Sequence, residues 1–436
     1  MSSQFLYEQI VIGRLPKEWE VARLGEFVDI NKKSIDPSKD SQNGKFLYID
    51  IDAVENGTGV IRNAKEILGK DAPSRARRVI YYNDVLMSTV RPYLKAFAIV
   101  PKSFHNQICS TGFAVLTCGD KIIPFYLFHT LFTKSVINQC KKMMVGGQYP
   151  ALSTSQVGKI RIPIPPLPEQ KKIADVLSTV DQGIEKVGEA IKKTQRLKNG
   201  LMQKLLTKGI GHKEFKETEI GRIPREWDVM KLGEIANVRY GLGQPPALET
   251  NGIPMIRATN VKRGRIVREG LIFINPGAVP NSRDPFLSVG DILVVRSGAY
   301  TGDVALVTKE WEGAIAGYDL IVTPSGTIDS QFLTYYLLSP PVQKRHFVGL
   351  KVRSAQPHLN SSQVEETPIP LPPLQEQQRI AEILSTVDER LESLRNRKEK
   401  LGRIKKGLMN DLLTGKVRVT KLIEREVQDS SSLRLE

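Results

Sequence analysis

Cysteine is scarce in this sequence: only Cys109, Cys118 and Cys140 occur among 436 residues. Their number is odd and none belongs to a C-x-x-C pair, so we expect neither a disulfide framework nor a zinc site. The pattern favours a reducing, cytoplasmic setting, with the thiols buried as small apolar side chains. Histidine is also rare, and the five histidines show no metal-ligand spacing: His105, His129, His212, His346 and His358.

Long apolar runs are absent as well. No segment approaches the roughly 18 apolar residues that a membrane-spanning helix needs. The first eight residues lack a basic stretch followed by an apolar one, so no secretory signal is expected.

Motifs of catalysis are also missing. The G-x-x-x-x-G-K-[ST] phosphate loop does not occur, and Gly415 before Lys416 is typical of a glycine that ends a helix. The G-x-G at 241–243 has no third glycine, and D-P-F at 284–286 lacks the remainder of a methyltransferase turn. No cluster of carboxylates suits a nuclease. We therefore expect no catalytic residue, resident metal or cofactor in this chain.

The charge of the chain points to its partner. Lysine and arginine number 63 against 47 aspartates and glutamates, which gives a formal charge of +16. A basic surface suits a polyanion, because each neutralised phosphate releases condensed counterions. Since charge also serves solubility, it does not by itself identify a nucleic-acid-binding protein.

The sequence is duplicated at a spacing of about 207 residues. IGRLPKEW at 12–19 recurs as IGRIPREW at 220–227, and the blocks that follow keep the same order. They are LGE at 24–26 and 232–234, DVL at 84–86 and DIL at 291–293, PAL at 150–152 and PHL at 357–359, and PLPEQ at 166–170 and PLQEQ at 373–377. Chance matches would not keep the same order and spacing across all these blocks, so the chain contains two copies of one unit.

Each copy begins with a β-rich body. In the first, the candidate strands are 46–51, 85–88, 96–100 and 113–117, with a short helix near 125–140. The second mirrors this layout with 255–258, 292–296, 304–308 and 332–338. A proline-rich segment closes each body, PIPPLP at 163–168 and PIPLPP at 368–373, and we expect it to be a stiff polyproline II joint.

A long helix follows each joint, over 169–206 and 376–413. Apolar residues step by four and three along both helices, a heptad pattern interrupted in the first by Thr194 and Lys198. Such a seam needs a partner, and the other copy, packed antiparallel, is the simplest one. Gly200 and Gly407 mark either a close helix contact or a tolerated glycine. The expected fold is of the mixed α+β class, with two globular bodies in a pseudo-twofold arrangement separated by two antiparallel coiled-coil helices.

The two copies differ in how well each part is preserved. The helices share 19 of 39 residues between 169–207 and 376–414, whereas the bodies share 5 of 17 between 84–100 and 291–307. Helices that stay alike are expected to meet the same partner twice, although packing within the seam also restrains them. Bodies that differ are expected to meet unlike targets, which on a basic protein means two DNA sequences.

Loops that follow strands and carry basic, amide or hydroxyl groups are the candidates for reading bases. Four such loops are 89–95, 146–150, 296–301 and 351–358. The candidate DNA-binding residues are Arg91, Tyr93, Lys95, Gln148, Tyr149, Arg257, Arg296, Ser297, Tyr300, Lys351, Arg353, Gln356 and His358. A second group is expected to bind phosphates rather than bases: Arg75, Arg77, Arg78 and Arg283.

The repeated G-[RI]-[LI]-P start, the D-[VI]-L strand and the P-P-L-x-E-Q joint followed by I-A-x-[IV]-L resemble the specificity subunits of Type I restriction-modification systems. The resemblance covers about 12–415 and occurs twice. It implies two target recognition domains, each reading one part of an interrupted DNA sequence. It also implies that the helices dock two methyltransferase subunits, to which two ATP-driven restriction subunits add. S-adenosylmethionine, ATP and magnesium would then belong to those partners.

The expected domains are a first target recognition domain at 1–165, a helical spacer at 166–210, a second recognition domain at 211–372, a helical spacer at 373–415 and a tail at 416–436 without a counterpart in the first copy. Two other functions remain open. A pure scaffold would use its bodies to bind proteins, and a fused endonuclease-methyltransferase would need a catalytic domain that about 207 residues per copy do not accommodate.

Overall fold

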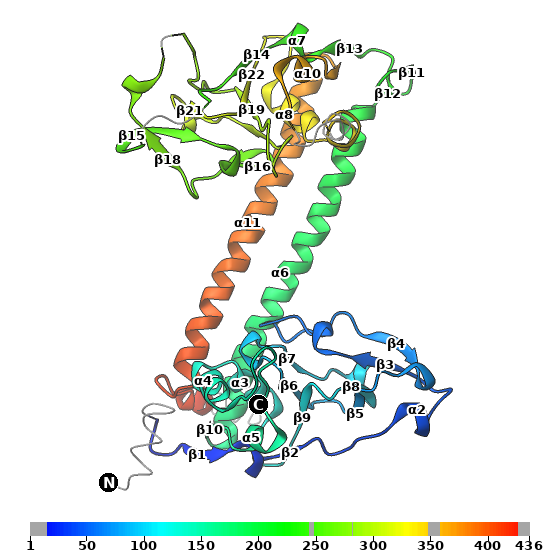
Figure 1. Ribbon diagram of the computed structural model, residues 1–436, viewed down its shortest axis with the longest axis vertical. Coiled ribbons are helices and arrows are strands. Elements are labelled where there is room, and N and C mark those ends of the chain that lie inside the picture. Colours follow the sequence, from blue (N-terminus) through cyan, green and yellow to red (C-terminus); the bar gives the residue numbers. More distant parts are fainter. Residues whose placement is uncertain (1–14, 244–247, 281, 348–357, 426–436) are drawn as a thin grey trace, which may run out of the picture. The chain divides into compact units, whose positions relative to one another are not determined.

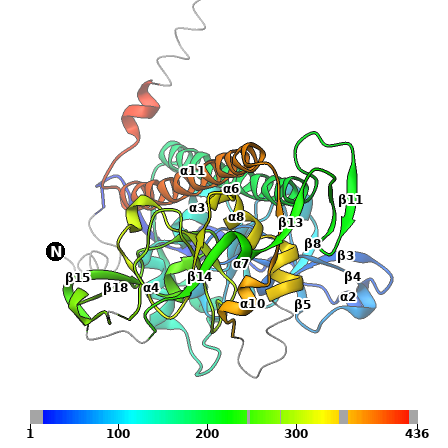
Figure 2. The same ribbon diagram turned by 90° about the horizontal axis from the view of Figure 1, so that it is seen from above.

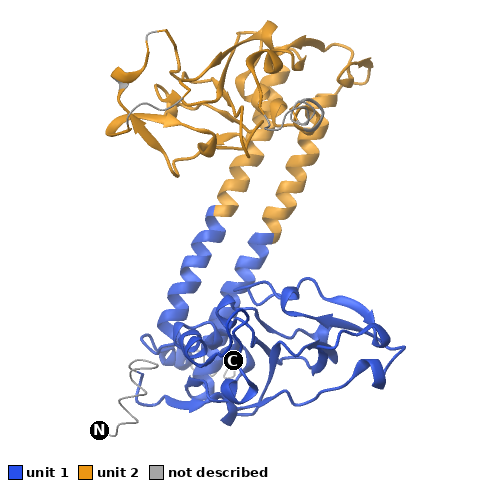
Figure 3. Cartoon of the chain, viewed as in Figure 1, with its two compact units in different colours: residues 1–188, 396–436 blue, residues 189–395 orange. Residues whose placement is uncertain are grey.

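The computed structural model describes residues 15–243, 248–280, 282–347 and 358–425. The chain divides into two compact units, residues 1–188 with 396–436 (unit 1) and residues 189–395 (unit 2), coloured separately in Figure 3. Both units mix helices and strands, which confirms the expected α+β class. Within the described ranges, no helix is both long and apolar enough to cross a membrane.

Two four-stranded sheets form the body of unit 1 (Figure 1). The antiparallel sheet has the order β2(Val28–Ile30), β9(Phe113–Cys118), β6(Val85–Ser88), β7(Phe97–Ile99). The other has the order β4(Lys65–Leu68), β3(Lys45–Ile49), β8(Gln107–Ser110), β5(Ala76–Ile80), with β3 and β8 parallel. Strand β6 is buried on both faces, because Val85 and Met87 enter one apolar cluster and Leu86 another. Burial on both faces explains why the sequence of β6 is continuously apolar. A strand with one exposed face would instead alternate apolar and polar residues.

Short helices cover the first sheet of unit 1. They are α3(Pro124–Leu131), α4(Lys134–Met143) and α5(Thr154–Gly158), with α2(Pro37–Asp40) beside the second sheet. The single helix expected near 125–140 is therefore two helices. The break falls at Thr133, whose hydroxyl caps α4 by accepting a hydrogen bond from the amide of Val136.

Unit 2 repeats this frame. Its antiparallel sheet has the order β14(Ala236–Tyr240), β22(Leu320–Pro324), β19(Ile292–Val294), β20(Val304–Leu306). Further strands of unit 2 are β11(Phe215–Thr218), β12(Gly221–Pro224), β15(Leu248–Ile256), β16(Val261–Lys262), β17(Arg265–Ile266), β18(Ile272–Ile274) and β21(Ile315–Ala316). Its helices are α7(Leu232–Ile235), α8(Ser330–Leu337) and α10(Ser361–Glu365). The pairing Ile292–Val322 reproduces Val85–Leu116 of unit 1, so the duplication extends to strand register.

The proline-rich segments are strands rather than the expected polyproline joints. β10(Arg161–Ile164) pairs antiparallel with β1(Glu20–Arg23), and β23(Pro368–Leu371) pairs in the same way with β13(Asp228–Lys231). Each is one of only two strands in its sheet, where proline is tolerated because one side of the strand needs no amide donor. Composition alone could not reveal the partner strand, which lies at the other end of the body sequence.

The long helices are α6(Leu167–Lys208) and α11(Leu374–Leu412), within two residues of the expected bounds. In unit 1, Gly183 of α6 lies near Leu401 of α11 and Gly188 lies near Lys398, so the segments run antiparallel. In unit 2, Leu205 and Leu206 share an apolar cluster with Ile380 and Leu384. The segments of each unit lie side by side (Figure 1, Figure 2). Within the described structure, a methyl group at Gly200 or Gly407 would meet no neighbouring atom within 4 Å. This favours a glycine tolerated in the helix over a close contact between helices.

A buried glutamine holds each body to the start of its long helix. Gln170 accepts a hydrogen bond from the Ile123 amide at 3.0 Å and donates to the carbonyls of Pro165 and Lys121 at 2.9 and 3.1 Å. Gln377 does the same in unit 2: it accepts from the Asp329 amide and donates to the carbonyls of Pro372 and Thr327. Both side chains are fully buried, so their polar atoms need these partners.

The glutamate before each glutamine accepts hydrogen bonds from a basic side chain, a histidine in unit 2 and an arginine in unit 1. Glu376 accepts from His212 Nε2 at 2.9 Å and from the Trp227 indole at 3.0 Å. Glu169 accepts from the Arg418 guanidinium, which also reaches Glu18 at 2.7 Å. Both carboxylates lie in the first turn of a helix, where the macrodipole also favours a negative charge.

The start of the tail, at Gly415 and Arg418, has a structural counterpart after the first long helix, which the sequence did not indicate. Gly209 and Gly415 both adopt positive φ values, 63° and 68°, just after the end of their helices, which confirms the helix-ending role expected of Gly415. Arg418 then stands where His212 stands in unit 2. The equivalence was invisible in the sequence because a histidine and an arginine perform the same task.

The polar interruption of the seam is an ion pair with an aromatic neighbour. In unit 2, Lys198 of α6 binds both carboxylate oxygens of Asp388 of α11 at 2.6 and 2.8 Å, and the Tyr335 hydroxyl donates to Asp388 at 2.8 Å. In unit 1 the equivalent pair is Asp181 of α6 with Lys405 of α11 at 2.5 Å. A polar pair inside an apolar seam disfavours other registers, because any shift leaves charges unpaired.

We predict that Lys198 and Asp388 are energetically coupled. A double-mutant cycle with Lys198→Ala and Asp388→Ala should give about 1.5–3 kcal/mol, the range for hydrogen bonds to charged groups, because Lys198 is only 13% exposed. The exposed pair Arg265–Glu392 of the same unit is the matched control and should give less than about 1 kcal/mol. Denaturant unfolding measures both, and equal couplings would contradict the prediction.

We also predict a histidine-dependent loss of stability in acid. His129, the counterpart of Tyr335, is 1% exposed, and burial lowers its pKa to about 3. In an unfolded chain, histidine titrates near about 6.5. The unfolded state thus gains a proton first, so the free energy of unfolding should decrease as the pH falls from about 6.5 toward 3. His129→Phe should flatten this part of a melting-temperature curve; an unchanged slope would refute the assignment.

Candidate nucleic-acid interface

Two of the predicted DNA-binding loops meet in unit 1. The loop after β6 bridges to the segment after 146–150 through Val90 and Ala151, and the Arg91 amide donates to the Pro150 carbonyl at 2.9 Å. The Arg91 guanidinium donates to the Gln148 carbonyl at 2.8 Å and lies 4.7 Å from the centre of the Tyr149 ring. Arg91 has a φ of 46°, a left-handed conformation that is uncommon outside glycine and asparagine. The structure therefore brings three predicted residues together, with Gln148 and Tyr149 exposed and Arg91 half-buried.

The other two predicted residues of this loop point into the body. Tyr93 is half-buried against the apolar core of unit 1. The Lys95 ammonium donates to the Phe132 carbonyl at 3.5 Å, a long contact. These positions favour a role in holding the loop, with Arg91, Gln148 and Tyr149 as its accessible part.

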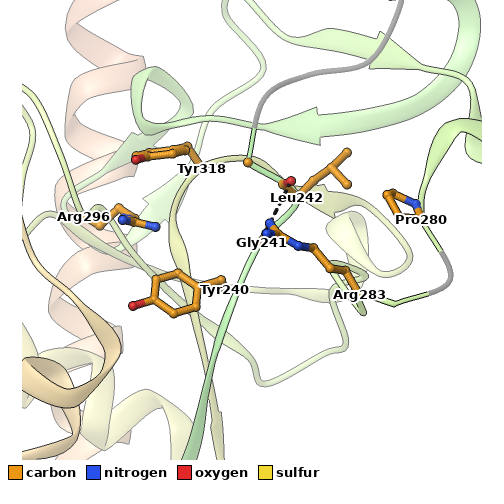
Figure 4. Close-up of a pocket in the computed structure, with 8 residues that line it drawn as sticks. Tyr240, Gly241, Leu242, Pro280, Arg283, Arg296 and Tyr318 are labelled. Carbon is orange, nitrogen blue, oxygen red and sulfur yellow. Dashed lines mark hydrogen bonds between the residues drawn. The ribbon is translucent and has the colours of Figure 1, made fainter.

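In unit 2 the equivalent loop is built around Arg296. Its guanidinium lies between two tyrosine rings, 4.8 Å from the centre of Tyr240 and 4.3 Å from that of Tyr318 (Figure 4). Ser297 bridges to His358, just as Val90 bridges to Ala151 in unit 1. Arg296 thus corresponds to Thr89 rather than to Arg91. Both units carry an arginine stacked on tyrosine, but from positions two residues apart in the common frame.

Of two further predicted residues of unit 2, Tyr300 lies on the surface and Arg257 lies partly within the body. Tyr300 is 40% exposed and is capped by the Lys262 ammonium, 4.1 Å from the ring centre. Arg257 is half-buried and donates to the Gly270 carbonyl at 2.6 Å, which favours a structural role. The predicted residues Lys351, Arg353 and Gln356 lie outside the described residues.

The four predicted phosphate-binding arginines have unlike surroundings. Arg75 is exposed, and Arg77 pairs with Asp36 at 3.0 Å. Arg78 donates to the Asn31 side chain and to the Phe113 carbonyl, and burial lowers its pKa. The exposed Arg283 donates to the carbonyls of Gly241 and Leu242 at 3.4 and 3.2 Å. Arg75 and Arg283 are thus exposed, whereas Arg78 ties separate segments together inside unit 1.

Sequence reasoning missed the tyrosines that hold Arg296 and the lysine that caps Tyr300. Tyr240 was visible only as the residue before a G-x-G, and Tyr318 carried no motif signal. Tyr240 ends strand β14, and Tyr318 lies between β21 and β22, so only the folded sheet brings them to either side of Arg296. Within the described residues, no group of three or more histidine, cysteine or acidic side chains could hold a metal ion.

Two similar bodies that present unequal arginine–tyrosine loops define a duplicated recognition protein. The family model described as "Type I restriction modification DNA specificity domain" matches residues 16–194 and again 224–403. The chain belongs to this family.

Relatives match over nearly the whole chain. The MjaVIII specificity subunit of Methanocaldococcus jannaschii is 30% identical over 420 residues, which cover 94% of this chain and 95% of the relative. The EcoKI specificity subunit of Escherichia coli is 23% identical over 408 residues, covering 86% and 83% of the two chains.

Solved structures show the same fold. One chain, from a study of complex assembly and conformational transition in the type I R-M system, is 27% identical with a TM-score of 0.56 and covers 93% of this chain and all of its own length. The S subunit from M. genitalium is 16% identical with a TM-score of 0.59, covering 92% and 98% of the two chains.

We predict that Arg75 and Arg78 differ in their effect on stability. Arg78→Met removes donors from a half-buried site and should lower the free energy of unfolding by about 1–3 kcal/mol. Arg75→Met changes an exposed side chain and should alter it by less than about 0.5 kcal/mol. Denaturant unfolding of the two variants checks this, and similar losses would overturn the distinction.

Proposed function

We propose that this chain is a non-catalytic, DNA-reading subunit of a Type I restriction-modification complex, in which each unit reads one part of an asymmetric, interrupted sequence. The observation that carries the proposal is the double match to a DNA specificity domain, one match to each copy of the duplicated frame. The unequal loops support asymmetry, because Arg91 and Arg296 start from different positions of that frame. Relatives named specificity subunits support the non-catalytic role.

We infer that the long helices bind the partner subunits. Their 19 identities in 39 positions contrast with the divergent bodies, which is expected when one partner type docks twice. Two methyltransferase subunits, followed by two ATP-dependent restriction subunits, would satisfy this symmetry. Catalysis and its cofactors would then belong to those partners, and the assembly would work in the cytoplasm, where its double-stranded DNA lies.

Co-expression with the candidate methyltransferase subunit, followed by methylome sequencing, tests this function. The wild-type chain should produce one split motif. Arg91→Ala should relax one half of that motif and leave the other half unchanged, because a bidentate arginine–guanine pair contributes roughly 1–3 kcal/mol of discrimination. Exchange of residues 15–163 for those of another family member should replace the same half.

Lys45→Ala provides the matched control, because Lys45 is an exposed cation of unit 1 that pairs with Glu66 away from the loop. It should leave the motif intact. A stable complex with the methyltransferase that produces no motif would instead support a scaffold. Relaxation of both halves by Arg91→Ala would contradict the division of the target between units.

A further inference from the structure

A cavity of about 620 Å³ opens beside Arg296 in unit 2 (Figure 4). Its lining combines two arginines, two tyrosines and four small or apolar residues: Tyr240, Gly241, Leu242, Gly243, Pro280, Arg283, Arg296 and Tyr318. The cavity lies outside the apolar clusters of the unit apart from Leu242, which is 8% exposed. Its chemistry suits a flat, electron-rich ligand, because rings provide stacking surfaces and guanidinium groups provide only donors.

The Arg296 guanidinium is fixed before any ligand binds. The tyrosine rings lie on either side of it, and its Nη2 is 2.5 Å from His358 Nε2. Since arginine only donates, this imidazole nitrogen must accept, so His358 is neutral there. Burial and the neighbouring arginine lower the pKa of His358, in agreement with that state. An arginine ordered in advance loses less side-chain entropy on binding.

Within the described residues, the Arg296 guanidinium has no carboxylate as a direct ion-pair partner. Asp319 is 2% exposed and accepts from the backbone amide of Arg296 at 3.3 Å, while burial raises its pKa to about 6. Within the described ranges, no acidic side chain forms an ion pair with the Arg296 guanidinium, and its buried Nε has no hydrogen-bond partner. The field of Arg296 lowers the pKa of Asp319, but the two side chains form no direct ion pair, and a guanidinium without a direct carboxylate partner suits an external acceptor.

Arg283 lies at another part of the same lining (Figure 4). Its Nη1 donates to the carbonyls of Gly241 and Leu242 by contacts of 3.4 and 3.2 Å, both long enough to be exchanged for a stronger acceptor. The two arginines therefore differ: Arg296 is rigidly oriented, and Arg283 is loosely held. A rigid fork suits reading of a base edge, and a loosely held cation suits a phosphate.

We propose that this cavity is the guanine-reading site of unit 2, in which Arg296 donates to O6 and N7 of one guanine while Tyr240 and Tyr318 act as positioning residues and Arg283 contacts a nearby phosphate. The proposal rests on the proposed DNA-reading function and assigns one letter of one half-site to one side chain. Guanine offers two adjacent acceptors in the major groove, matching an arginine fork.

Methylome sequencing with the methyltransferase subunit tests the assignment. Arg296→Ala should make one guanine of one half-site degenerate, with about a tenfold or greater loss of discrimination at that position, and preserve every letter of the other half. Arg296→Lys should keep the charge but lose the same letter, because an ammonium lacks the planar fork. Weaker modification spread evenly over all letters of the half-site, without a loss at one guanine, would show a phosphate contact instead and overturn the proposal.

The tyrosines provide a second, independent variant pair. Tyr318→Phe keeps the ring over Arg296 and should keep the letter, whereas Tyr318→Ala should weaken discrimination at the same guanine only. The matched control is Arg268→Ala, an exposed arginine of unit 2 that pairs with Glu310 and should leave the motif unchanged. If Arg296→Ala does not accumulate, the lysine and Tyr318 variants decide the question.

Failure of the inference is distinguishable from failure of the proposed function. A wild-type complex without any split motif would refute the DNA-reading function itself. A wild-type motif that stays intact in Arg296→Ala and Arg296→Lys would retain that function and remove the cavity from it.

Discussion

The fold depends on the attachment of each long helix to its body through one buried carboxamide. Gln170 and Gln377 each satisfy one amide and two carbonyls of segments that would otherwise be buried without partners. A glutamine provides both an acceptor and two donors at one point, and glutamate or leucine of similar size would leave some of these groups unpaired. The body therefore takes its orientation on the helix from hydrogen-bond geometry as well as from apolar packing.

The two units share this attachment of body to helix but differ in their loops. A strand pairing and a bridge recur in both, but the arginine of the loop arises at the position of Thr89 in one unit and two residues further along in the other. Moving a cation along a fixed loop changes where its donors lie without disturbing the sheet beneath. In this chain the frame and the loops are therefore separate features, so that a loop can change while the frame stays the same.

Periodic and repeated features could be predicted from the sequence, because local pattern determines them. The helix bounds, β6 and the α+β class follow from such patterns. The proline segments were misassigned because their strand partners are distant in sequence. The tyrosines around Arg296 escaped prediction for the same reason: no spacing rule links residues 240, 296 and 318. In the sequence, Lys198 is only a polar interruption of the apolar heptad pattern. Its partner, Asp388 of the other helix, is known only from the structure.

The ion pair with Glu169 makes the segment after the last long helix important for the first body. Arg418 follows the last long helix, yet the carboxylates that it binds, Glu169 and Glu18, belong to the first copy of the repeat. Proteolytic removal of Arg418, or a bulky group fused close after it, would thus disturb the body that is synthesised first. During translation, that body would also have to wait until Arg418 emerges before the start of its helix is fully secured.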